Sequence, residues 1–161
     1  MVESIKLVLG KGVEGDAHFG TSIQHRSRVR KDPSQPNLRQ IHLIHAELFK
    51  ELLGKGFSIK PGELGENILT AGIDLLSLPK NTELHFDGEA AIRLTGLRNP
   101  CQQLNEFQAG LMQALLDRTS EGKLIRKAGV MGMVIRGGTV QAGSVVSIKL
   151  PPESHQILER V

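Results

Sequence analysis

The chain has 161 residues, of which 39% are hydrophobic and 23% are charged, a composition typical of one soluble globular domain. Its net charge of +3 is only weakly basic, and five Phe without Trp or Tyr leave few rings on which nucleic-acid bases could stack. The single cysteine excludes an internal disulfide and a zinc site built from several thiolates of one chain.

These features predict one domain over residues 1–161 in a reducing compartment, the cytoplasm. The N-terminal sequence MVESIKLVLGKG lacks the uninterrupted apolar stretch of a signal peptide. No segment approaches the ~20 apolar residues that span a bilayer, so no membrane contact is expected.

Strand patterns separated by glycine turns dominate the chain. Residues 4–9 (SIKLVL) predict the first strand, and residues 38–44 (LRQIHLI) predict a strand covered on both faces, because apolar residues fall on both of its sides. Residues 81–96 predict two strands joined by a tight turn at Asp87-Gly88. Residues 130–150 repeat this pattern, with a turn expected at Gly137-Gly138.

Two short helices are expected between these strands. Residues 45–53 form an amphipathic pattern that ends at Gly54. The second helix is expected near residues 100–116, because Asn99 is a favoured N-cap, Pro100 suits the first helical position, and apolar residues recur at helical spacing: Leu104, Phe107, Leu111 and Leu115. Many short strands with few helices predict a mainly β fold, a closed or nearly closed β-barrel with short peripheral helices.

The single cysteine, Cys101, falls in the first turn of this second predicted helix. Unpaired amide N–H groups and the positive end of a helix dipole stabilise a thiolate in such a place, and Arg98 adds positive charge nearby. These surroundings suit a nucleophile or a soft-metal ligand. The alternative is that Cys101 packs as a small hydrophobic side chain, and the local pattern leaves both open.

Five segments, in this order along the chain, resemble the MOSC family, which is named for the C-terminal domain of molybdenum cofactor sulfurase. They are GVEGDAHFG (12–20), LRQIHLI (38–44), PGELGENI (61–68), TGLRNPCQQL (95–104) and KAGVMGMVIRGGTVQAGSVV (127–146). The resemblance covers nearly the whole chain and is closest to the small stand-alone bacterial members.

The resemblance implies a β-barrel like the inserted barrel domain of pyruvate kinase. It also implies catalysis by a cysteine, here Cys101, that either ligates molybdenum in a pterin cofactor (molybdopterin) or carries sulfur as a persulfide to a metal centre. Related molybdenum proteins reduce N-hydroxylated substrates. A sulfur-donor or electron-transfer protein would be the partner, whereas pyridoxal phosphate belongs to a fused sulfurase domain and is not expected.

The resemblance also implies cofactor-binding residues. Within the GDAH and GEN matches these are Asp16, His18, Glu66 and Asn67, and Arg98 is the arginine of the R-x-P-C motif. The alternative for Asp16 and His18 is a turn with a surface histidine. For Glu66, Asn67 and the neighbouring Glu63, the alternative is a loop that uses glycine for tight turns. We expect the loops with Asp16, Asn67 and Cys101 to meet at one concave site.

The segment HRSRVRK (25–31) carries the strongest local positive charge. Arg26, Arg28 and Arg30 alternate, so in an extended chain they would point the same way and could bind a phosphate or another anion. The alternative is a solvated loop. His42 and His45 are interpreted as structural.

Two other functions remain open at this stage. One is a small basic β-barrel that binds nucleic acid through the 25–31 segment without redox chemistry, although the low charge and scarce aromatic residues make nucleic acid an unfavoured partner. The other is a metal-free thiol enzyme, which would need a base or a second thiol. The leading hypothesis is a molybdenum-cofactor-associated protein that works through Cys101.

Overall fold

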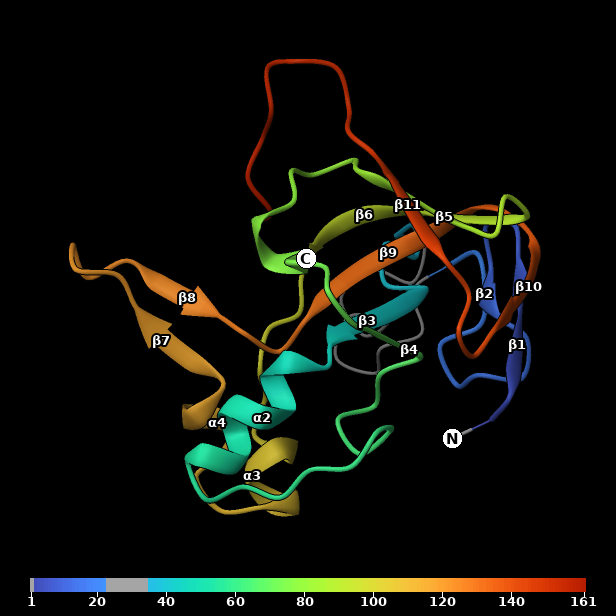
Figure 1. The fold of residues 1–161 in the computed structure, drawn as a ribbon. Coiled ribbons are helices and arrows are strands. Elements are labelled where there is room, and N and C mark those ends of the chain that lie inside the picture. The colour runs from blue at the N-terminus through green and yellow to red at the C-terminus, as the bar shows by residue number, and fades with distance from the viewer. Residues whose placement is uncertain (1, 23–34) are drawn as a thin grey trace.

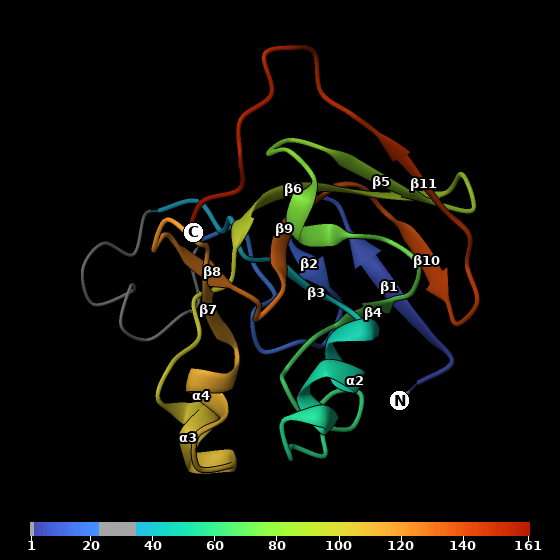
Figure 2. The same cartoon turned by 60° about the vertical axis from the view of Figure 1, so that its left-hand side comes forward.

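The computed structural model describes residues 2–22 and 35–161 (Figures 1 and 2). Within them the fold is mainly β, and its largest sheet has six strands in the order β11-β5-β6-β9-β3-β4. Neighbouring strands are antiparallel except for the parallel pair β3–β4. The strands of this sheet are β3 (Ile41–His45), β4 (Ile68–Thr70), β5 (Glu83–Phe86), β6 (Ala90–Leu97), β9 (Val130–Arg136) and β11 (Val146–Lys149).

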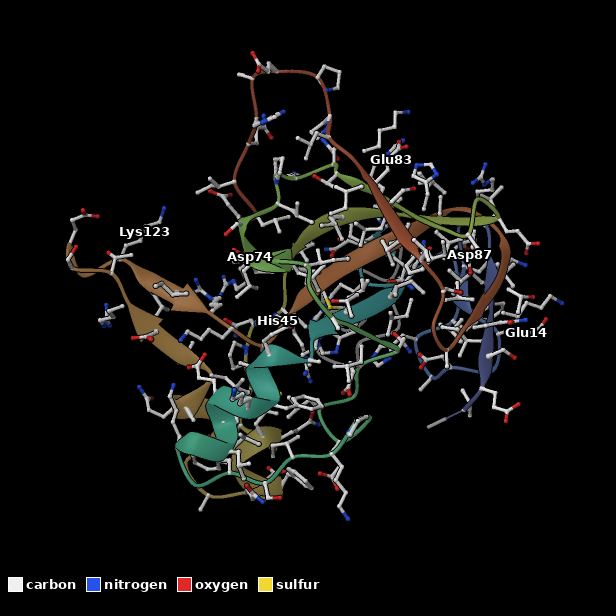
Figure 3. All side chains as sticks on the ribbon, in the orientation of Figure 1. Glu14, His45, Asp74, Glu83, Asp87 and Lys123 are labelled. Carbon is white, nitrogen blue, oxygen red and sulfur yellow. The ribbon has the colours of Figure 1, made fainter. Side chains whose placement is uncertain are left out.

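Two smaller sheets complete the described β structure. The first pairs β1 (Ser4–Val8) with β10 (Gly138–Gln141) on one side and with β2 (Gly12–Val13) on the other. The second is a hairpin of β7 (Leu116–Arg118) and β8 (Leu124–Arg126) that projects from the body of the molecule (Figures 1 and 2). Lys123 lies in the projecting part of this hairpin (Figure 3).

The large sheet is an open half-barrel, which corrects the expectation of a closed or nearly closed barrel. Its end strands, β11 and β4, are not hydrogen-bonded to each other. The expected hairpin at Gly137-Gly138 is also wrong, because β9 and β10 do not pair. After Gly137 the chain leaves the large sheet, and β10 pairs with β1 instead, so the small sheet packs against β6 and β9.

The β3 strand separates two apolar cores, as expected for a strand covered on both faces. Ile41 and Leu43 face the core between the sheets, whereas Ile44 faces a second core under the helices. All three side chains are fully buried. Gln40, just before β3, connects the two larger sheets by donating to Gly10 O at 2.9 Å and accepting from Val134 N at 3.0 Å.

The described helices are short. The expected first helix is confirmed as α2 (Glu47–Gly54), which packs Leu48 and Leu52 into the second core. A 3-10 turn, η1 (Leu75–Ser77), follows β4. No helix in residues 2–22 and 35–161 has the length and apolar character needed to cross a bilayer.

The second predicted helix is wrong as a continuous element. It is divided into α3 (Gln103–Phe107) and α4 (Leu111–Ala114), because Gln108 is extended and Gly110 takes a left-handed φ of 86°. The residue that caps α3 is Gln102, not Asn99. Cys101 therefore precedes a helix of only five residues. The dipole of so short a helix gives little stabilisation to a thiolate at this position.

The 158–161 segment returns beside the end of β6. Leu97 donates its N–H to Glu159 O at 2.7 Å and accepts from Val161 N at 3.2 Å. A side chain at Gly96 would overlap this segment, since an added Cβ would lie 2.5 Å from Glu159 O. This packing fixes the end of β6 immediately before Arg98 and Cys101.

Candidate functional site

Asp16 joins the first two candidate segments. It lies on the loop after β2, where its Oδ1 accepts the backbone N–H of His18 at 2.7 Å and lies 3.2 Å from His18 Nδ1. Its Oδ2 accepts from Asn67 Nδ2 at 2.9 Å. Two motifs that are 51 residues apart in sequence thus meet through one carboxylate.

Asn67 is in turn fixed to β3 through His42. Its Oδ1 accepts from His42 N at 2.8 Å, and its own N–H donates to His42 O at 2.9 Å. The side-chain amide of Asn67 therefore has a defined orientation, with oxygen toward β3 and nitrogen toward Asp16.

The imidazole of His42 is buried between two backbone carbonyls. Nε2 lies 2.7 Å from Ala128 O and Nδ1 lies 3.2 Å from Gly65 O. Burial lowers the pKa of His42 to about 3, and the positive charge of Arg98 acts in the same direction. A neutral ring has one N–H, and the shorter contact indicates that it donates to Ala128 O. His42 is structural, as expected, but its role in holding the 61–68 loop had no local sequence signal.

Arg98 brings positive charge to the cysteine segment. Its Nη1 donates to Leu64 O at 2.6 Å, and its backbone N–H donates to Gly129 O at 3.0 Å. Burial lowers the pKa of Arg98, while the negative charges of Cys101 and Glu66 raise it. The guanidinium thus lies within electrostatic reach of both groups.

Glu66 has one satisfied and one unsatisfied carboxylate oxygen. Oε1 accepts the backbone N–H of Gly62 at 2.5 Å, whereas Oε2 is buried and has no hydrogen-bond partner among the described residues. Glu63, the other carboxylate of this loop, is exposed and accepts the N–H of Lys60 at 2.7 Å. The structure therefore places the two glutamates of this loop in different surroundings.

Cys101 is half-buried, and its Sγ lies 3.6 Å from Gln103 Oε1. The segment before it is tied to the β7–β8 hairpin, because Asn99 Oδ1 accepts from Arg126 Nε at 3.0 Å. The Asn99 side chain, which the sequence pattern predicts as a helix cap, therefore bonds to Arg126 instead. Arg126 is a further residue that local patterns did not identify.

The remaining candidates contribute less to this cluster. Arg26, Arg28 and Arg30 lie outside the described residues. His45, at the end of β3 (Figure 3), has a buried Nδ1 without a partner among the described residues. Within 2–22 and 35–161, no group of three or more His, Cys, Asp or Glu side chains could hold a metal ion. The concavity of the site stays a prediction.

Comparisons with known proteins agree with this organisation. The model of the MOSC domain matches residues 16–147. Among solved structures, the YuaD protein from Bacillus subtilis is similar with a TM-score of 0.73 and 23% identity, over 94% of this chain and 87% of that one. YiiM from Escherichia coli is similar with a TM-score of 0.66 and 20% identity, over 96% of this chain and 67% of that one. No curated protein matches the chain.

At these identities the solved structures support the fold alone, whereas the family model addresses the sequence itself. Its matched region spans most of the chain and includes Asp16, the 61–68 loop and Cys101. The chain therefore belongs to the MOSC domain family, which is associated with the molybdenum cofactor.

Proposed function

We propose that this protein binds a molybdenum-containing pterin cofactor through the Cys101 thiolate and acts as a molybdenum-dependent reductase. The observation that carries the proposal is the half-buried Arg98 side chain, which donates to Leu64 O at 2.6 Å in the loop that carries Glu66 and lies within electrostatic reach of Cys101. A nearby cation compensates the charge of a thiolate that ligates a metal, and thiolate is a soft ligand.

The ligand set favours a metal that arrives inside an organic cofactor. The described residues provide one thiol and no cluster that could hold a bare ion. A single protein ligand is sufficient when the other metal ligands belong to the cofactor. The chain's own role would then be to hold the sulfur in place and to balance its charge.

The unpartnered oxygen of Glu66 fits the organic part of such a cofactor. A buried carboxylate oxygen without a donor is costly, and a bound group that supplies an N–H would satisfy it. A pterin ring has amine and amide N–H groups along one edge, and these match a carboxylate. Asp16 would support this loop through its hydrogen bond with Asn67.

When bound, the cofactor would supply two-electron redox chemistry. The chain would contribute the thiolate of Cys101, the compensating charge of Arg98 and the acceptor of Glu66. His42 would keep the 61–68 loop in position through its backbone hydrogen bonds with Asn67, and Arg98 would do so through the carbonyl of Leu64.

A sulfur-carrier function is the second candidate, and it uses the same cysteine. Cys101 is only half-buried and is followed by the exposed residues Gln102 and Gln103, so a partner protein could reach a persulfide there. This function needs no acceptor at Glu66. The carboxylate therefore distinguishes the two candidates.

The test is to produce the protein in a host that makes the cofactor and to purify it without air. Metal analysis and fluorescence of the oxidised pterin should give about one molybdenum and one pterin per chain. Cys101→Ser should lose most of the molybdenum. Glu66→Gln should lower pterin retention, whereas Glu63→Gln is the matched control and should retain it.

Wild-type protein without molybdenum and without pterin would contradict the proposal. If that protein instead released cyanide-labile sulfur that depended on Cys101, the sulfur-carrier function would be supported. Equal pterin content in the Glu66 and Glu63 variants would remove Glu66 from the site.

A further inference from the structure

The pair formed by Asp16 and His18 is an acid–base arrangement that cofactor binding alone does not require. Asp16 Oδ1 lies 3.2 Å from His18 Nδ1 and accepts the backbone N–H of the same residue at 2.7 Å. This geometry favours the neutral tautomer with hydrogen on Nδ1. Nε2 then carries the lone pair, and it has no protein partner among the described residues.

The backbone around His18 is firmly held. Asn37 is buried, and its Nδ2 donates to His18 O at 2.8 Å and to Gly20 O at 3.0 Å. Its Oδ1 accepts the N–H of Arg39 at 3.1 Å. Because the main chain and the ring nitrogen are both fixed, the free nitrogen of His18 has a limited set of positions.

The other described histidines have different surroundings. The ring of His42 is enclosed by two carbonyls, that of His85 contacts Glu83 and Arg136, and that of His155 uses Nε2 to contact Pro151 O. The ring of His45 has a buried Nδ1 without a partner among the described residues. In His18 the carboxylate contact is at Nδ1 and the side chain is 54% exposed. Water can thus reach the ring, and the Asp16 carboxylate lies beside its Nδ1.

His18 also lies beside the candidate site. The Asp16 carboxylate that contacts its ring is bonded through the other oxygen to Asn67, and Asn67 adjoins Glu66. The histidine is therefore at the edge of the same cluster of loops, on the side of the 61–68 loop that Asp16 approaches.

We propose that His18 is the proton donor for the substrate of this site and that Asp16 is the positioning residue that orients its ring. This inference rests on the function proposed above and concerns substrates with an N–OH group. Reduction of N–OH to N–H consumes two electrons and two protons and releases water. An external one-electron donor supplies the two electrons, one from each of two donor molecules.

In the step assigned to His18, Nε2 of the neutral ring first takes a proton from water. The Nε2–H bond then breaks and an O–H bond forms on the departing hydroxyl, which leaves as water when the N–O bond breaks. The substrate nitrogen takes the second proton from solvent. The ring is left as the tautomer with hydrogen on Nδ1, which faces Asp16 Oδ1. Water then returns a proton to the exposed Nε2.

The first test reads the tautomer directly and needs no cofactor. In protein labelled with nitrogen-15 at histidine, the neutral ring of His18 should give the spectrum of the Nδ1–H form. Asp16→Asn should shift it toward the Nε2–H form that free imidazole prefers, while the signals of His155 stay unchanged. A wild-type ring already in the Nε2–H form would overturn the orientation by Asp16.

The second test uses cofactor-loaded protein, N-hydroxybenzamidine as the probe substrate and reduced methyl viologen as the electron donor. His18→Gln keeps a side chain able to reach Asp16 but transfers no proton, so kcat should fall by about 100-fold or more. KM should change less than about threefold, and molybdenum content should be unchanged. His155→Gln is the control and should keep the wild-type kcat.

The outcomes separate the two proposals. An active wild type with an unchanged kcat in His18→Gln would overturn the role of His18 and leave the proposed function intact. Loss of molybdenum in His18→Gln would assign the histidine to cofactor binding and also overturn the proton-donor role. A loaded wild type without activity on the probe overturns both the reductase function and the role of His18.

Discussion

Replacing Gly129 by alanine should destabilise the fold where the cysteine segment meets β3. Gly129 has a φ of +91°, and an added Cβ would overlap Leu43 O. The same Cβ would lie 2.8 Å from Ile44 Cγ1 and 2.9 Å from His42 Nε2. Backbone atoms of a central strand cannot move aside cheaply, so the 127–129 segment must shift.

The cost has two parts. The left-handed backbone costs a residue with a side chain about 1–2 kcal/mol. Moving the segment also weakens two hydrogen bonds, from His42 to Ala128 O and from Arg98 N to Gly129 O, at roughly 1 kcal/mol each. The total of about 3–4 kcal/mol is a large share of the ~5–15 kcal/mol by which domains are stable.

Gly122→Ala is the matched control. Gly122 has a similar φ of +82° in the β7–β8 turn, but an added Cβ would meet nothing within 4 Å. This variant should lose only about 1–2 kcal/mol. Because the chain has no Trp or Tyr, urea unfolding is best followed by far-ultraviolet circular dichroism.

The difference between the two variants isolates the steric part of the effect. We expect Gly129→Ala to lose about 2 kcal/mol more than Gly122→Ala, or to fail to fold while the control folds. Equal free energies of unfolding in the two variants would refute the steric argument.

Three further predictions concern buried polar groups. Gln40→Leu should lower the free energy of unfolding by about 2–4 kcal/mol in urea titrations, because the partly buried carbonyl of Gly10 and the buried amide of Val134 lose their partner. An unchanged free energy of unfolding would contradict this. The free energy of unfolding of the wild type should decrease as pH falls from 6.5 toward about 3, and His42 should contribute up to roughly 5 kcal/mol of this decrease. The reason is that His42 binds a proton in the unfolded chain over this pH range, whereas its buried ring in the native protein stays neutral. This contribution is complete above pH 6.5, and a His42→Gln variant with the same pH dependence as wild type would disprove it. Lys127→Met should lower the free energy of unfolding by about 1–2 kcal/mol, measured by thermal unfolding. Lys127 is mostly buried, and its Nζ lies 2.8 Å from a carboxylate oxygen of Glu51 and 2.9 Å from one of Asp117. High salt should destabilise the wild type more than the variant.

The parts of the fold that were predicted correctly depend on contacts between residues close in sequence. The turn at Asp87-Gly88 connects β5 and β6, and both residues have the positive φ that such turns need. The spacing of apolar residues in α2 likewise places Leu48 and Leu52 in a core. In both cases the residues that form the pattern in the sequence are also the residues that form the element in the structure.

The errors have the opposite character. The 100–116 pattern has helical spacing, but Asn99 is bonded to Arg126 and Gly110 interrupts the segment. The barrel stays open because the chain leaves the large sheet after Gly137 to pair with β1. The Asn99–Arg126 hydrogen bond and the pairing of β10 with β1 depend on partners more than ten residues away, which a local pattern does not contain.

The sequence by itself determined the strand-rich character, the family motifs and the identity of the one thiol that could react. Only the tertiary structure decided which polar groups from separate motifs meet: it placed Arg98 within reach of Glu66, turned Glu63 to solvent and joined Asp16 to Asn67. The physical reason is that electrostatic reach and hydrogen bonding depend on distance in space. Motifs tens of residues apart acquire those distances only when β3, β6 and β9 bring their loops together.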